Sequence, residues 1–223
     1  MFKFPFGLIL ILALFSSSAW AQSDSAKYED EDDEGTWVIP SMNEKHKPGI
    51  KLGTGFYTFT GGEMDNPTPM LGLNGTIYYR YKYNEKSAIQ IETGISFKGS
   101  NFANSAGEYS RMRLYYLDAP LTWVRSLNKN NTTHLNIGVQ YAYLLNASIF
   151  IEPSPIPETQ KPALSKHDMM LVAGTQFYSG FVGFQVMAKY GLLNINNGLI
   201  PNLNPPLKNK DIHNFALELS LLF

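Results

Sequence analysis

Cysteine is absent from the 223-residue sequence, and its absence excludes several kinds of protein at once. A chain without thiols has no disulfide scaffold, no thiolate metal site and no lipidated cysteine after an export signal. An excess of positive charge is also lacking, since 18 lysines and arginines stand against 19 acidic residues. This balance does not favour nucleic acid as a partner. Packing and hydrogen bonds must therefore hold the molecule together.

The sequence also lacks an apolar run long enough for a membrane-spanning helix, which needs about 20 residues. Its apolar run at residues 6–15 follows Lys3 and precedes a stretch of small residues that ends at Ala21. A basic start, a short apolar stretch and small residues before a cleavage site are typical of a secretory signal peptide. We predict a signal peptide over residues 1–21, read by the export machinery and cleaved after Ala21.

Residues 22–48 follow as a tail that contains the unbroken acidic run Glu29–Glu34. Blocks of like charge repel themselves and are usually solvated and disordered. We predict a disordered acidic tail. A cation site and a docking strip for a basic partner are the alternatives for the run.

The rest of the chain, residues 49–223, is dominated by alternation of apolar and polar side chains. In one segment Ile89, Ile91 and Ile95 oppose Gln90 and Glu92. Strict alternation over ten or more residues indicates a β-strand, and strands of this length suit a bilayer, which needs about 9–11 residues. The pattern predicts eight strands, near residues 49–60, 71–83, 89–98, 110–127, 135–143, 165–178, 181–193 and 211–223.

The predicted connections alternate between short and long. Short turns rich in Asn, Gly and Ser are typical of tight hairpins, and longer external loops are typical of outer-membrane barrels. We therefore predict an all-β fold, an eight-stranded antiparallel up-and-down transmembrane β-barrel in the bacterial outer membrane, with both termini periplasmic. Aromatic side chains near both strand ends fit two interfacial girdles in contact with outer-membrane lipid. The long connections span residues 61–69, 99–109, 147–164 and 194–210.

Eight strands enclose an interior just wide enough for side chains to fill. Charges inside must pair, because an isolated buried ion is costly. We predict a lumenal ion-pair network around Glu92, Asp118 and Glu218, and a plugged lumen rather than an open pore. Its basic candidates are Lys51, Arg80, Lys82, Lys98 and Lys189. The inward glycines that would relieve crowding are Gly53, Gly55, Gly72, Gly94, Gly138, Gly174 and Gly183.

Pro120 interrupts the predicted strand 110–127. Proline cannot donate to a strand ladder, so its presence indicates a bulge or a local bend. Such a bend would account for an apparent slip of the alternation between Arg113 and Tyr116.

The last nine residues place an apolar side chain at every odd position. This stripe resembles the carboxyl-terminal signal, ending in phenylalanine, by which the barrel-assembly machinery recognises its clients. The resemblance implies that machinery as a partner and makes the stripe an assembly signal. Its residues are Phe215, Leu217, Leu219, Leu221 and Phe223.

Three motifs resemble the PorT-like family of outer-membrane β-barrels. They are the segments 116–121 (YLDAPL), 138–147 (GVQYAYLLNA) and 189–195 (KYGLLNI). Asp118 stands where that family more often has glutamate, and Lys189 stands where arginine is frequent. The resemblance implies an eight-stranded barrel, and some members of the family are linked to type IX protein secretion.

Enzymatic activity is the least favoured reading of the sequence. Ser165, His167 and Asp168 lie together, with His213 at another strand end, but adjacent residues of a strand face opposite ways. We therefore assign no catalytic, cofactor or metal site. The favoured function is a structural or accessory component of envelope or secretion machinery. The alternatives are a binding or adhesion barrel acting through residues 147–164 and 194–210, and a lipid-modifying barrel enzyme.

Overall fold

The computed structural model describes residues 45–61, 67–103, 109–152, 159–160, 164–197 and 211–223. The chain divides into two units, residues 1–38 and 39–223, and all the described residues belong to the second. The predicted signal peptide, its cleavage site at Ala21 and the acidic run Glu29–Glu34 lie outside the described residues.

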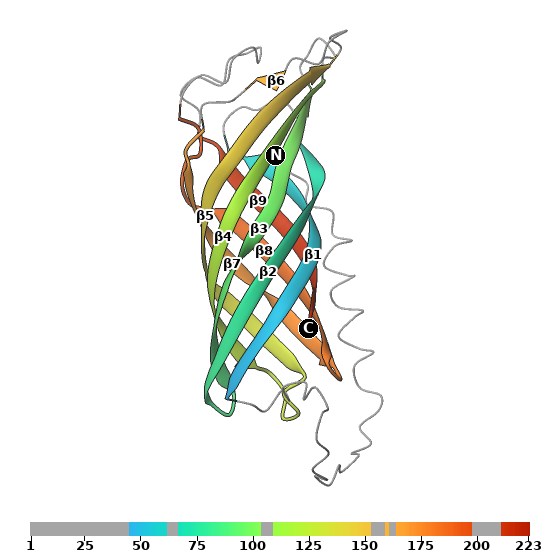
Figure 1. Cartoon of the computed structure of the whole chain (residues 1–223), viewed down its shortest axis with the longest axis vertical. Helices are drawn as coiled ribbons and strands as arrows, with labels where there is room; N and C mark the ends of the chain where they lie inside the picture. The colour runs from blue at the N-terminus through green and yellow to red at the C-terminus, as the bar shows by residue number, and fades with distance from the viewer. Residues whose placement is uncertain (1–44, 62–66, 104–108, 153–158, 161–163, 198–210) are drawn as a thin grey trace, which may run out of the picture. The chain divides into compact units, whose positions relative to one another are not determined.

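Eight long antiparallel strands form a closed ring in the described part of the chain (Figure 1). Each strand pairs with two neighbours in the order β1-β2-β3-β4-β5-β7-β8-β9, and β9 returns to β1. The predicted eight-stranded barrel is therefore confirmed. The strands are β1 (His46–Thr60), β2 (Thr68–Asn84), β3 (Ser87–Ala103), β4 (Tyr109–Ser126), β5 (Thr133–Glu152), β7 (His167–Ser179), β8 (Val182–Gly191) and β9 (His213–Leu222), and the two-residue β6 (Thr159–Gln160) pairs with β5.

The two ends of the barrel differ in their connections. We call one end, at the bottom of Figure 1, the short-turn end, because tight turns join β2 to β3, β4 to β5 and β7 to β8 there. The opposite end, which carries the longer links, is the long-connection end. Within the described ranges, no helix is long and apolar enough to cross a membrane.

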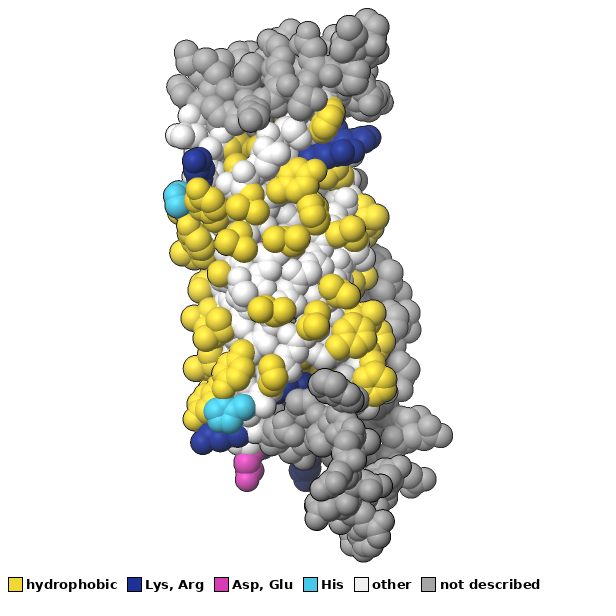
Figure 2. Space-filling model, in the orientation of Figure 1, with side chains coloured by type: hydrophobic (Ala, Val, Ile, Leu, Met, Phe, Trp, Pro, Cys, Tyr) yellow, Lys and Arg dark blue, Asp and Glu magenta, His cyan; other side chains and the backbone are white. Residues whose placement is uncertain are grey.

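Successive side chains of each strand point alternately out of the barrel and into it, as the pleat requires. On β2, Leu71 and Leu73 are about 60% exposed, whereas Asn74, which lies between Leu73 and Ile77, is buried. On β9, Leu219 and Leu221 are exposed and Glu218 is 1% exposed. Figure 2 shows the hydrophobic side chains gathered over the middle of the barrel, with charged ones towards its ends. This outer surface suits lipid.

Several strands are longer than the sequence predicts. β3 continues to Ala103 and β5 to Glu152, so residues 99–103 and 147–152, predicted as loop, are paired strand. β1 begins at His46, where its pairing with β2 extends beyond the last residues of β9. Pro48 therefore costs no bond to β9. The sequence predicts shorter strands because, beyond the apolar belt, the outward-facing side chains are no longer consistently apolar.

The bulge predicted at Pro120 is wrong, because the register is the same on both sides of that residue. Pro120 pairs with Gln140 of β5, and two residues of each strand in the β3–β4 ladder are left without a paired partner there. The bulge lies in β5 instead: Tyr116 pairs with Leu144 while Tyr115 pairs with Asn146. Leu145 is the extra residue, and β4 alternates without a slip.

Candidate functional site

Three buried ion pairs occupy the interior of the barrel. Lys98 Nζ lies 3.0 Å from Asp118 Oδ1, and Lys189 Nζ lies 2.7 Å from Glu218 Oε2. The third pair joins Lys51 of β1 to Glu92 of β3 across the intervening β2. All six side chains are at most 5% exposed. The structure thus brings each of the three predicted lumenal carboxylates into contact with one lysine.

Neutral side chains donate further hydrogen bonds to two of these carboxylates. Tyr57 Oη donates to Glu218 Oε1 at 2.9 Å, and Gln90 Nε2 donates to Glu92 Oε1 at 2.7 Å. Thr76 Oγ1 donates to Glu92 Oε2 at 3.2 Å. A buried carboxylate is tolerated when a cation and further donors replace its water. The ion pairs therefore fill the middle of the interior without leaving isolated charge.

Arg80 and Lys82, the other two basic candidates, lie nearer the short-turn end and form no ion pair among the described residues. The Arg80 guanidinium donates to Gln90 Oε1 from Nε at 2.8 Å and from Nη2 at 2.6 Å. Nη2 also donates to Gln176 Oε1 at 2.6 Å. Arg80 is thus bonded to two neutral amides, and Lys82 is half-buried below it.

An apolar layer that sequence reasoning missed fills the interior towards the long-connection end. On β4 the outward Arg111 and Arg113 alternate with the inward Met112 and Leu114, which are fully buried. Apolar side chains inside and charged ones outside invert the pattern of a lipid-facing strand. This inversion is the sequence signal for strands that have left the bilayer. The layer comprises Phe59, Met112, Leu114, Tyr116, Ala142, Leu144, Ala147, Ile149, Leu164, Ile195 and Ile212.

Connecting segments contribute Leu164, Ile195 and Ile212 to this layer, each at most 8% exposed. Backbone hydrogen bonds hold these segments together: Ser165 N donates to Ile195 O at 2.8 Å, and Ile195 N donates to Ile212 O at 2.9 Å. The long-connection end is therefore packed with apolar side chains as well as ringed by strands.

Ser165, His167 and Asp168 do not converge. Asp168 is fully buried inside the barrel, where its Oδ2 accepts a hydrogen bond from Asn214 Nδ2 at 2.6 Å. His167 lies on the outer face, with its Nδ1 2.6 Å from Tyr141 Oη. Ser165 Oγ donates to the His167 carbonyl at 3.0 Å. The described residues also contain no group of three or more His, Asp or Glu that could hold a metal ion.

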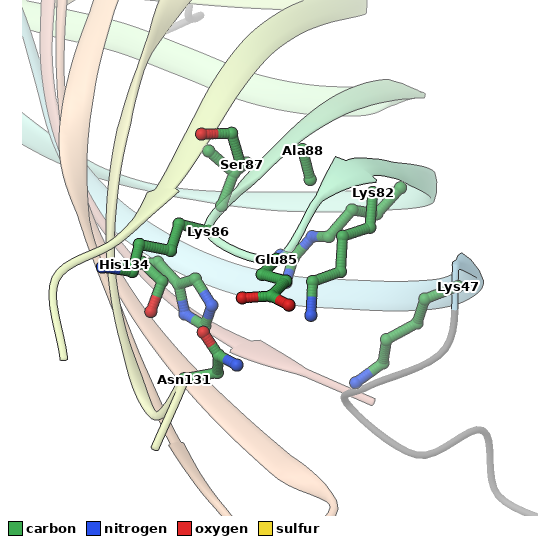
Figure 3. Close-up of a pocket in the computed structure, with 11 residues that line it drawn as sticks. Lys47, Lys82, Glu85, Lys86, Ser87, Ala88, Asn131 and His134 are labelled. Carbon is green, nitrogen blue, oxygen red and sulfur yellow. The ribbon is translucent and has the colours of Figure 1, made fainter. Parts of the chain in front are cut away.

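A hollow that is open to solvent lies at the short-turn end of the interior. Figure 3 shows Lys47, Lys82 and His134 reaching towards one opening from β1, β2 and β5. We call this hollow the basic mouth. Its charged and titratable lining groups are Lys47, Arg80, Lys82, Glu85, Lys86 and His134.

A closed antiparallel barrel with an apolar outer belt and a filled interior defines the class of integral outer-membrane barrels, because closure pairs every backbone group that lipid cannot satisfy. The chain belongs to the family described as outer membrane protein beta-barrel domain, whose model matches residues 20–197. No curated protein matches the chain.

Solved outer-membrane barrels share limited similarity with the chain. Ail of Yersinia pestis, solved with the heparin analogue sucrose octasulfate, is 14% identical over 81% of this chain and 100% of its own, with a TM-score of 0.46. Neisserial surface protein A is 10% identical over 80% and 98%, with a TM-score of 0.44. OprG from Pseudomonas aeruginosa is 11% identical over 82% and 99%, with a TM-score of 0.39. None of these similarities supports an inference about binding.

Proposed function

We propose that the protein is a non-enzymatic barrel that serves as a structural or accessory component of the envelope or of type IX protein secretion machinery. The observation that carries the proposal is the filled interior, with three ion pairs at mid-height and an apolar layer above them. Because the interior of the barrel is filled, its outer surface and its two ends are the parts available to contact other molecules. The resemblance of segments 116–121, 138–147 and 189–195 to PorT-like proteins supports the secretion role.

Orientation and assembly belong to the same proposal. Short turns on the periplasmic side, as is general for outer-membrane barrels, would place both chain ends in the periplasm. The stripe from Phe215 to Phe223 would serve as the assembly signal. Phe223 also closes the seam of the ring, since its N–H donates to Ile50 O at 2.9 Å and its carbonyl accepts from Ile50 N at 3.0 Å.

A filled interior predicts that the protein does not conduct ions. Reconstituted in a planar lipid bilayer, the purified barrel is expected to add no stepwise current above that of the lipid alone, because Lys98, Asp118 and the apolar layer obstruct the lumen. A porin reconstituted in the same way is the positive control. A stable ohmic channel from the wild-type protein would contradict the obstructed lumen.

Deletion of the gene tests the secretion role. We expect the deletion strain to show reduced surface export of type IX substrates, and a plasmid copy to restore it. Unchanged export, with the outer membrane otherwise intact, would overturn the role in secretion. Crosslinking followed by purification in detergent would then identify the envelope proteins in contact with the barrel.

A binding or adhesion role is the second candidate, and the packed long-connection end favours it. β4 and β5 pair as far as Tyr109 and Glu152, and Leu164 and Ile195 pack in the apolar layer at the same end of the barrel. A rigid platform of this kind presents loops at low entropic cost. The same deletion strain separates the candidates, because loss of surface attachment with normal export favours adhesion.

A further inference from the structure

The balance of charge changes along the barrel interior. At mid-height, three lysines face three carboxylates in one-to-one pairs. Among the described residues that line the basic mouth, four are cations, Lys47, Arg80, Lys82 and Lys86, and one is a carboxylate, Glu85. At the same end, Tyr78 Oη donates to Phe223 O at 3.2 Å. Among the described residues that line the mouth, the balance of charge is therefore positive.

A buried cation, Arg80, lies at the inner end of the basic mouth. Arg80 is 8% exposed and lies over the rings of Tyr78 and Tyr178 at 5.9 and 5.4 Å. Within the described part of the chain, its hydrogen bonds go to neutral amides. Gln176 Nε2, buried beside Arg80, has no hydrogen-bond partner among the described residues. A buried donor without an acceptor is costly. Arg80 thus presents a buried positive charge to the mouth and has no carboxylate partner among the described residues.

The spacing of the cations indicates the shape of the anion. Arg80 and Lys82 are alternate residues of β2, so their side chains leave the same face about 7 Å apart. Side chains two residues apart in an extended peptide have the same spacing. Lys86, in the adjoining turn, continues the basic surface to the rim (Figure 3). A single small anion would contact one of these cations, whereas a chain of carboxylates would contact several of them.

The position inside the ring also restricts the ligand. Arg80 and Lys47 are buried on the inner face, on the opposite side of the strands from the apolar belt. Headgroups of lipids around the barrel would meet the outer face. We propose that the basic mouth binds an acidic peptide segment in extended conformation. This inference is independent of the secretion role and would apply equally to an adhesion barrel.

A binding experiment with purified protein tests the proposal. The probe is a fluorescent peptide EDEDDE, which has the sequence of residues 29–34 of the chain itself. Because that run has the chemistry of the proposed ligand, the full chain is compared with a variant in which its six acids become glutamine or asparagine. We expect this variant to bind the peptide. We also expect the binding to weaken progressively as the salt concentration rises.

Substitutions at the rim locate the site. The double variant Lys82→Gln/Lys86→Gln is expected to weaken peptide binding at least about fivefold, since charge-assisted hydrogen bonds are lost. Lys129→Gln, an exposed cation in another short turn that does not line the mouth, is the matched control and should bind as before. Arg80→Gln is measured only if it retains the gel shift of a folded barrel on heating.

Three outcomes would overturn the assignment. The first is absence of binding in the variant that lacks the acidic run. The second is equal weakening by Lys129→Gln and by the rim variant, which would indicate non-specific attraction. The third is displacement of the peptide by inorganic phosphate at matched ionic strength and equal anion concentration, which would assign a small-anion site instead. Tighter binding by the variant lacking the acidic run than by the full chain would support the proposal.

Discussion

Glu218→Gln is expected to lower the free energy of unfolding of the barrel by about 3–5 kcal/mol, the usual cost of removing one partner of a buried ion pair. The substitution keeps the shape of the side chain but leaves Lys189 without the carboxylate that lies 2.7 Å from its ammonium group. It also removes the charged acceptor of the Tyr57 hydroxyl. Urea unfolding in detergent micelles, followed by tryptophan fluorescence, measures the change.

Two variants show whether the uncompensated lysine causes this loss. Glu218→Gln/Lys189→Met removes the cation as well and should recover most of the stability, because an apolar replacement of a buried ion pair is often neutral or stabilising. Glu85→Gln removes an exposed turn carboxylate and should change the free energy by no more than about 0.5 kcal/mol. Unfolding of Glu218→Gln at the wild-type urea concentration would contradict the importance of the pair.

Gly138→Ala is the second substitution with a large expected effect, a loss of about 3 kcal/mol, at the upper end of the usual cost of overpacking. A Cβ atom at Gly138 would lie 2.1 Å from the Leu121 carbonyl oxygen and 2.7 Å from Thr122 Cα. Both are backbone atoms of β4, so the two strands must separate. The fraction of protein that shows a heat-modifiable gel shift, together with urea unfolding, measures the effect.

Gly75→Ala is the matched control for this prediction. A Cβ at Gly75 would meet only Leu52 Cδ2 at 3.5 Å, an ordinary contact, so the barrel should assemble as the wild type does. Gly138→Val should extend the trend and leave little folded barrel. Equal assembly of the Gly138 and Gly75 variants would show that the inward glycines do not limit strand approach.

The fold was predictable because its signals are local. Alternation with a period of two, tight turns after every second strand and a closing stripe are readable from residues close together in the chain. The same local signal misleads near Arg113, where charged residues on the outer face imitate a slip of the strand. Outward charges of this kind are expected where a strand extends beyond the lipid, and the sequence of one segment does not show where that occurs.

The composition of the interior was only partly predictable. The sequence indicated that Glu92, Asp118 and Glu218 face inwards, but it did not indicate the apolar layer above them. That layer depends on the bulge at Leu145, which turns Ala147 and Ile149 inwards beside Met112. A bulge is a feature of two paired strands rather than of one sequence.

By itself, the sequence determined that apolar and polar side chains alternate between the two faces of the barrel wall along its middle, because the β pleat sends successive residues to opposite faces. The tertiary structure decided which lysine meets which carboxylate. Lys51 and Glu92 lie on strands that are not neighbours, so their contact depends on the relative heights of β1 and β3. Those heights are set by the stagger with which all eight strands close the ring. The same stagger gathers Lys47, Arg80 and Lys86 at one mouth.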